Sequence, residues 1–231
     1  MSKDNNLEWQ NGDLPYSQEF GDHFYSRADG RLECDHVFLR GNNVQERWTA
    51  TERFSIGELG FGTGLNLLET WRQWVEQRKA GQTLLFTSFE LYPMQASEIE
   101  RALKSWPILG EQTGVLIENW NAVTKGKLVA LDGQTFFQLV VGDVREMLPI
   151  WDGAADAWFL DGFAPSKNPQ MWEEEMLKAL ARKTNPGGTV ATYTAAGWVR
   201  RNLIAAGFDM QKCPGHAGKR EMMKGVFQSQ D

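Results

Sequence analysis

Apolar and polar residues repeat with two different periods along the chain. Short, nearly continuous apolar runs predict buried strands, and they lie at residues 53–59, 83–90, 136–141, 155–160 and 189–194. Between these runs, apolar side chains recur at the spacing of a helix with one buried face. The helices predicted in this way are 65–79, 94–106, 170–183 and 196–206. Strands that alternate with helices indicate a parallel sheet covered by helices on both faces.

Two segments depart from this alternation. Residues 126–141 contain two β-type runs that flank Asp132-Gly133, which predicts a β-hairpin insertion. The last two predicted strands, 208–213 and 221–228, are joined by a short glycine-bearing loop, so we expect the final strand to be antiparallel. The result is a Rossmann-like α/β fold with a seven-stranded, mostly parallel sheet. We expect residues 1–50 to form an N-terminal extension packed on a core domain of residues 51–231.

The composition favours a single core. The chain has 231 residues, of which 42% are hydrophobic, and this is enough for one sizeable domain. Its apolar runs fall short of the ~20 residues that a membrane-spanning helix needs, and the polar segment 1–10 lacks the features of an export signal. Cys34 and Cys213 are too few for a disulfide framework or a structural zinc site, so we expect both to serve packing. The sequence therefore predicts a cytoplasmic protein, which we expect to be a monomer.

The charge is unevenly distributed. A net charge of -6 taken alone argues against a nucleic-acid partner, because binding to a polyanion draws on Lys and Arg. Residues 182–224, however, hold eight basic and two acidic side chains. A basic C-terminal quarter on an acidic body is compatible with RNA contact through one face, and a solvated charge pattern explains it equally well.

A glycine-rich turn, ELGFGTG, follows the first predicted strand of the core. Its three alternating glycines let the backbone approach a ligand closely and adopt torsions that other residues resist. The spacing differs from the G-x-G-x-x-G of dinucleotide-binding folds and resembles the first motif of S-adenosylmethionine-dependent methyltransferases. Acids and aromatic faces nearby favour the sulfonium charge of that cofactor. The alternative is a turn that serves only tight packing. The expected cofactor-binding residues are Glu58, Gly60, Phe61, Gly62, Thr63, Gly64 and Asn66.

Two further acids follow predicted strands. In open α/β sheets, ligands bind beyond the carboxyl ends of the strands. Glu90 ends the second strand, where a carboxylate can accept both ribose hydroxyls. Asp143 follows the next strand and is expected to accept from the exocyclic amine of adenine, with Val144 against the ring. A purely turn-forming role for the Gly-Asp pair stays open.

The most distinctive string, ADAWFLDGFAP, occupies residues 155–165. It is an apolar strand that ends in an acid, an aromatic residue and a proline at the same edge of the sheet. Methyl transfer requires alignment of a nucleophile and a place for its proton. We expect the Asp161 carboxylate to orient an attacking amine and Phe163 to offer a stacking face, while a helix-capping or turn role for Asp161 is the alternative. Lys167 either meets a substrate phosphate or is simply solvated.

Three strings carry a resemblance to a known family. With ELGFGTGLN at residues 58–66, WFLDGFAPSKNP at 158–169 and GKREMMKG at 218–225, the chain resembles the methyltransferase domain of the MnmC family almost from end to end. The resemblance implies methylation of the 5-aminomethyl group of a wobble 2-thiouridine in tRNA, with S-adenosylmethionine as the donor. It also implies that Glu58, Gly60, Gly62, Glu90 and Asp143 bind the cofactor and that Asp161 lies beside the methyl group.

The same resemblance suggests partners and leaves alternatives. In many family members a flavin-dependent oxidase domain follows, whereas this sequence stops at Asp231, so we expect no FAD in this chain. Arg201, Lys219 and Arg220 become candidates for contact with the phosphates of an anticodon stem-loop. The alternatives are a methyltransferase acting on another amine, in a small molecule or a protein, and a non-catalytic RNA-binding relative.

Overall fold

A computed structural model describes residues 6–25, 29–218 and 220–228, and its centre is an eight-stranded sheet. The strand order is β10-β11-β9-β8-β4-β5-β7-β6. Pairing is parallel from β9 to β7, while β11 runs antiparallel to both of its neighbours. The sheet comprises β4 (Arg53–Leu59), β5 (Thr83–Glu90), β6 (Val129–Ala130), β7 (Thr135–Val141), β8 (Ala155–Leu160), β9 (Thr184–Thr192), β10 (Phe208–Pro214) and β11 (Glu221–Phe227).

The predicted fold class is therefore confirmed. Seven strands form the expected mostly parallel sheet with a reversed last strand. The eighth, β6, is the short arm of the predicted hairpin, and it pairs antiparallel with β7 at the edge. The bounds of β4, β5 and β8 agree with the prediction at every residue.

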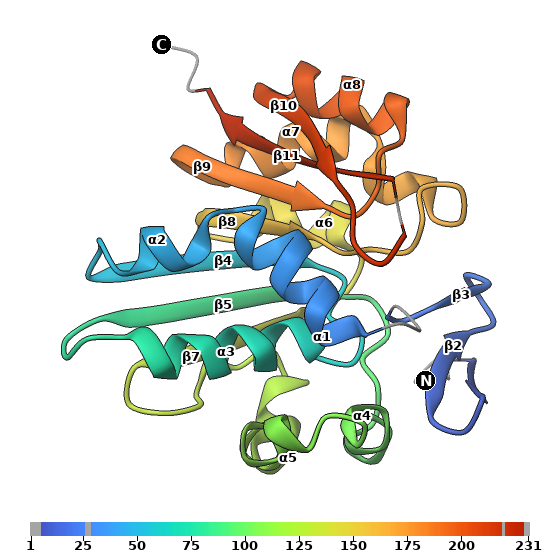
Figure 1. Cartoon of the computed structure of the whole chain (residues 1–231), viewed down its shortest axis with the longest axis vertical. Coiled ribbons are helices and arrows are strands. Elements are labelled where there is room, and N and C mark those ends of the chain that lie inside the picture. The colour runs from blue at the N-terminus through green and yellow to red at the C-terminus, as the bar shows by residue number, and fades with distance from the viewer. Residues whose placement is uncertain (1–5, 26–28, 219, 229–231) are drawn as a thin grey trace.

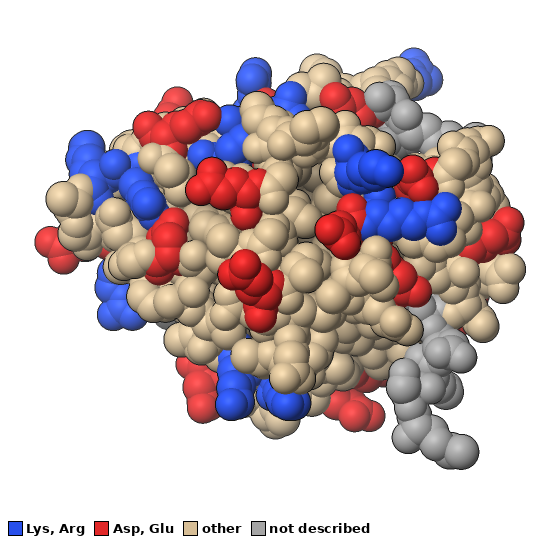
Figure 2. Space-filling model, turned by 90° about the horizontal axis from the view of Figure 1, so that it is seen from below, with Lys and Arg blue, Asp and Glu red and all other residues tan. Residues whose placement is uncertain are grey.

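Helices cover both faces of the sheet (Figure 1). One face carries α1 (Gly30–Glu33), a π-helix (Cys34–Arg40), α2 (Val44–Trp48) and α3 (Leu65–Gln77). The opposite face carries α6 (Val144–Ile150), α7 (Glu174–Arg182) and α8 (Gly197–Ala205). The remaining helices, α4 (Ala96–Leu103) and α5 (Gly110–Val123), lie below the first layer, with α5 against α3 and β7. Seen from below, this side of the molecule has interspersed acidic and basic side chains (Figure 2).

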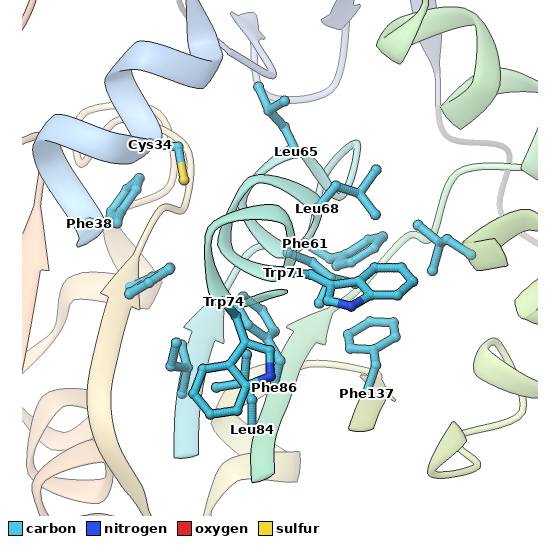
Figure 3. Close-up of a cluster of buried hydrophobic side chains, with 14 of the residues drawn as sticks. Cys34, Phe38, Phe61, Leu65, Leu68, Trp71, Trp74, Leu84, Phe86 and Phe137 are labelled. Atoms are coloured by element: carbon cyan, nitrogen blue, oxygen red, sulfur yellow. The ribbon is translucent and has the colours of Figure 1, made fainter. Parts of the chain in front are cut away.

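Buried apolar side chains form a cluster on each face. The first cluster joins α3 to the sheet through Trp71, Trp74 and Phe86, and Figure 3 shows these rings packed between helix and strands. Both tryptophans belong to a set of buried α3 residues that begins at the first position of the helix. The second cluster lies under α7 and α8 and includes Trp158 and Leu203. Because both faces are buried, the strands are rigid supports for the loops at their carboxyl ends.

The structure differs from the prediction in several helices and one strand. Helix α5 was not predicted, although its buried residues Leu116, Trp120 and Val123 keep a helical spacing, because two glycines and a proline just before them obscured the pattern. Helix α6 was also missed, and α4 is shorter than residues 94–106. Strand β9 begins five residues before the predicted strand 189–194, so the Asn-Pro-Gly-Gly stretch at 185–188 lies inside it, opposite a register shift in β8. A 3-10 turn at Pro169–Trp172 precedes α7.

The N-terminal segment forms a small sheet of its own. Strands β1 (Leu7–Gln10), β2 (Leu14–Ser17) and β3 (Asp22–His23) pair antiparallel. Arg101 of α4 forms an ion pair of 2.7 Å with Asp13 and lies over the ring of Trp9. These contacts hold the small sheet at the carboxyl edge of the large one (Figure 1). Within the described ranges, every helix is too short or too polar to cross a membrane.

Candidate active site

A cavity of about 660 Å³ opens at the carboxyl edge of the sheet. The parallel register brings Leu59, Phe89 and Leu160 level with one another, so the residues that follow β4, β5 and β8 meet there. The N-terminal segment forms the facing wall. Of the predicted site residues, the cavity is lined by Gly60, Phe61, Gly62, Thr63, Asn66, Glu90, Asp143, Val144, Asp161 and Phe163.

The turn after β4 requires glycine at its alternating positions. Gly60, Gly62 and Gly64 have φ values of +88°, +54° and +79°, which side chains with a β-carbon rarely adopt. The Gly60 amide donates to the Phe89 carbonyl (2.9 Å), and a β-carbon on Gly60 would lie 3.0 Å from the Asp161 carbonyl oxygen. The turn is thus pressed against the loop that carries Asp161. Gly64 does not line the cavity, since its α-carbon packs against the ring of Phe61.

Glu90 is held by the backbone of neighbouring loops. Its Oε2 accepts from the Gly62 amide (3.1 Å) and its Oε1 accepts from the Tyr92 amide (2.9 Å). Burial raises the pKa of the carboxyl, and the backbone amides act in the opposite direction. The backbone amides thus fix the carboxylate on the cavity wall at the end of β5.

Asp143 caps the N-terminus of α6 and is paired with Arg145. Its side chain accepts from the Arg145 amide (2.9 Å), and the Arg145 guanidinium contacts both carboxylate oxygens. This pairing holds the pKa of Asp143 below its ordinary value. The structural role left open for the Gly-Asp pair is therefore present, although Asp143 and Val144 do lie on the cavity wall.

Asn66 connects two carboxylates that come from neighbouring strands. Its Nδ2 lies 2.9 Å from Glu58 Oε1 and 2.6 Å from Asp161 Oδ2. Glu58 has no exposed surface and does not line the cavity, so it lies behind Asn66, and its contact with the cofactor stays a prediction. Burial raises the pKa of Glu58 well above its ordinary value, and Asp161 and Glu90 add to this effect.

Phe163 is covered by the N-terminal segment. Its ring stacks on Phe20 with centroids 4.6 Å apart and meets Phe24 edge to face at 5.3 Å. Asp22 accepts from the Ala164 amide (3.3 Å), which attaches β3 to the same loop. The Phe163 ring lines the cavity, but Phe20 already stacks on one of its faces. Only the other face is therefore left for the predicted stacking on a ligand.

The sequence reasoning missed the residues of the facing wall. Tyr193 donates to the Gly162 carbonyl (2.7 Å) and lines the cavity together with Asp22, Glu33 and Cys34. Burial raises the pKa of Tyr193 well above its ordinary value, with further contributions from three acids, Asp161 among them. Tyr193 directly follows β9 and could have been found by the rule that located Asp161. The wall residues from the N-terminal segment had no such signal.

The candidate RNA-binding residues lie apart from the cavity wall. Lys167, Arg201 and Arg220 are exposed, and Lys167 neighbours Asn168, which does line the cavity. Lys219 lies outside the described residues. Within the basic quarter, Lys212 is paired with Glu221 at 2.7 Å, so part of that charge is neutralised locally.

The charge of the cavity wall distinguishes between two cofactors, S-adenosylmethionine and a dinucleotide. In the described part of the chain, its wall carries six carboxylates and one guanidinium. Such a wall repels a pyrophosphate and attracts a sulfonium cation. Gly60 and Gly62 line the cavity with backbone atoms only, which a ligand can approach closely. The residues present therefore fit S-adenosylmethionine and disfavour a dinucleotide.

This sheet order, the glycine turn and the carboxylates at successive strand ends define a class I methyltransferase. The model of a family described as S-adenosyl-L-methionine-dependent methyltransferase matches residues 109–228. The chain belongs to that family, and S-adenosylmethionine is its methyl donor.

Comparison with individual proteins adds detail. The chain is 46% identical over 228 residues to the tRNA 5-methylaminomethyl-2-thiouridine biosynthesis bifunctional protein MnmC of Stutzerimonas stutzeri, covering 96% of this chain and 34% of that protein. The protein of the same name from Chromobacterium violaceum is 45% identical over 224 residues, with 95% and 34% covered. The chain thus spans about a third of the length of these relatives. The resemblance to the MnmC family seen in the motifs is confirmed.

A solved structure shows the same fold over nearly the whole chain. MNMC2 from Aquifex aeolicus superimposes with a TM-score of 0.78 at 19% identity, covering 99% of this chain and 74% of that one. At this identity the likeness concerns the fold. The match includes the range that holds the N-terminal sheet as well as the core.

Proposed function

We propose that this methyltransferase transfers a methyl group to the primary amine of a 5-aminomethyl-2-thiouridine at the wobble position of tRNA, forming 5-methylaminomethyl-2-thiouridine. The observation that carries the proposal is the 46% identity, across 96% of the chain, to a protein named for the biosynthesis of that nucleoside. The acidic cavity supports it, because an aminomethyl group is a cation in water and is drawn to carboxylates.

We assign five residues to the donor side of the cavity. Gly60 and Gly62 give the methionine end access to the backbone, Glu90 accepts from the ribose hydroxyls, and Val144 packs on the adenine ring. Asp143 faces the exocyclic amine from its cap position and shares its charge with Arg145. When bound, S-adenosylmethionine supplies an electrophilic methyl carbon, and the electron pair of the broken carbon–sulfur bond stays on the sulfur, which becomes a neutral thioether.

The acceptor side is assigned to Asp161. The bound ammonium first releases one proton to solvent. The Asp161 carboxylate then accepts a hydrogen bond from an N–H of the neutral amine and so directs the nitrogen lone pair toward the methyl carbon. The nitrogen gains a positive charge as it forms its new bond, and Asp161 receives the proton that the product sheds. Asp161 lies on the cavity wall beside the Gly60 turn, so both halves of the reaction share one site.

Contact with tRNA and with an oxidase belongs to the same proposal. Lys167 stands beside the cavity loop, and Arg201, Lys219 and Arg220 supply positive charge for phosphates of an anticodon stem-loop. Relatives are named bifunctional, which supports fusion to, or cooperation with, a flavin-dependent oxidase that yields the amine. We assign residues 51–231 as the methyltransferase domain and residues 1–50 as an extension that completes the acceptor wall.

Incubation of the protein with tRNA that lacks the final methyl group, followed by nucleoside mass analysis, tests this function. A methyl-labelled donor is expected to produce labelled 5-methylaminomethyl-2-thiouridine, while tRNA that already carries this nucleoside takes up no label. Transfer to free amines or to protein, with tRNA left unmodified, would show that the acceptor is of another class. Binding of tRNA without any transfer would identify a non-catalytic relative.

A further inference from the structure

The amide of Asn66 holds the orientation of the Asp161 carboxyl group. An amide nitrogen carries two hydrogens, and the Nδ2 of Asn66 directs them at two acids, Glu58 Oε1 at 2.9 Å and Asp161 Oδ2 at 2.6 Å. Asn66 is 7% exposed and belongs to the first turn of α3, whose buried face anchors it to the sheet. Its position is therefore set by the core and not by the loop that carries Asp161.

The surroundings of Asp161 make this donor important. Asp161 faces titratable groups from several elements, and most of them are acidic. Without a donor between them, the carboxylates of Glu58 and Asp161 would face each other at short range in a site of low dielectric. Glu58 of β4 interacts with Asp161 from behind the cavity wall, and the titratable groups that line the cavity with Asp161 are Glu19, Asp22, His23, Tyr25, Glu33, Cys34, Glu90, Tyr92, Asp143, Arg145 and Tyr193.

We propose that Asn66 is a positioning residue for methyl transfer, which binds the Asp161 carboxylate in its anionic form and directs it at the acceptor amine. This rests on the proposed function of Asp161. Asn66 also lines the cavity, so its predicted contact with the cofactor stays a prediction beside this role. Glu58 serves as the second anchor of the same amide, which gives a role to a buried acid of β4 that does not line the cavity.

Two single variants test the proposal. Asn66→Ala removes the donor, and Asn66→Asp keeps the shape but replaces the donor with a third acid. Both are expected to lower kcat by about 10²-fold, the usual effect of a misplaced reacting group, with KM for tRNA and the dissociation constant of S-adenosylhomocysteine little changed. Loss of a hydrogen bond to a charged group is expected to move the acidic limb of the kcat profile to higher pH by about one unit. Asn119→Asp, on α5 and remote from the cavity, is the matched control.

A double variant separates positioning from stability. Glu58→Gln combined with Asn66→Asp restores the hydrogen bond and the charge of that pair, yet still leaves Asp161 opposite a carboxylate. We expect the thermal midpoint to recover relative to Asn66→Asp alone while kcat stays low. Recovery of both would show that Asn66 is structural only and would overturn the proposal.

A measurement without tRNA distinguishes this inference from the proposed function. In protein labelled with ¹³C at aspartate carboxyls, the titration midpoint of Asp161 is expected to be higher in Asn66→Ala than in the wild type by about one pH unit. An unchanged midpoint overturns the inference whatever the acceptor is. Failure of the wild type to methylate tRNA, with the midpoint shifted as expected, would instead remove only the assigned substrate.

Discussion

Replacement of Gly60 by alanine tests how closely the glycine turn and the Asp161 loop are packed. Gly60 has φ +88°, and an added β-carbon would lie 3.0 Å from the Asp161 carbonyl oxygen and 3.3 Å from the Gly162 α-carbon. Both neighbours are backbone atoms, so the contact cannot be relieved by the rotation of a neighbouring side chain. The turn and the loop must therefore separate, and this separation displaces the two halves of the site.

Gly81 is a matched control because it isolates the backbone strain. It has φ +84° and an added β-carbon would meet nothing within 4 Å. An L-residue in this region costs roughly 1–2 kcal/mol, and this cost applies to both substitutions. Overpacking adds about 1–3 kcal/mol at Gly60 alone. We therefore expect Gly81→Ala to lower the free energy of unfolding by the backbone cost alone, and Gly60→Ala to lower it by the backbone cost plus the overpacking cost.

Two assays measure these losses. Urea unfolding with an unchanged m-value gives the free energy of unfolding of each variant, and calorimetric titration with S-adenosylhomocysteine gives the affinity. If about 1.4 kcal/mol of the Gly60 strain is relieved by opening the turn, affinity falls about tenfold. Equal losses in Gly60→Ala and Gly81→Ala, with unchanged affinity in both, would refute the packing of the turn against the loop.

Three further predictions concern the acids and the RNA. Asp161→Asn is expected to keep S-adenosylhomocysteine affinity near the wild-type value and to cut methylation by roughly 10²-fold or more, and near-normal turnover would exclude the assigned role. Because burial raises the pKa of Glu58 well above its ordinary 4.5, the stability it contributes is present below that pH and declines as the pH rises. Glu58→Gln should therefore make the loss of unfolding free energy between acidic and neutral pH shallower, whereas an identical slope would contradict the raised pKa of Glu58. Charge reversal at Lys219 and Arg220 is expected to raise KM for tRNA and reduce its salt dependence without changing cofactor affinity, and an unaltered salt slope would place the RNA elsewhere.

Much of the donor side was predictable because it depends on local patterns. Strand ends are marked by apolar runs that stop at an acid or a glycine, and parallel strands bring those ends to one edge. Gly60, Glu90 and Asp161 were found in this way, and the structure places all three on one cavity. Helix α5 was missed because its glycines weaken the pattern, although its buried face keeps the helical period.

The remaining parts of the site depend on contacts between distant segments. Phe20 stacks on Phe163, although the two residues are 143 positions apart in the sequence. Neither hydrophobic periodicity nor turn chemistry predicts such a contact. The sequence likewise did not predict that Asp143 has an ionic partner, and the structure shows that this partner is Arg145.

The sequence by itself determined the central strands, the reversed last strand, the glycine turn and the order of acids along one sheet edge, because periodicity and turn chemistry act over a few residues. Only the tertiary structure decided that Asn66 bridges Glu58 and Asp161 and that residues of the N-terminal segment line the cavity. These arrangements follow from which surfaces pack together, and that depends on the shape of the whole core and not on any local pattern.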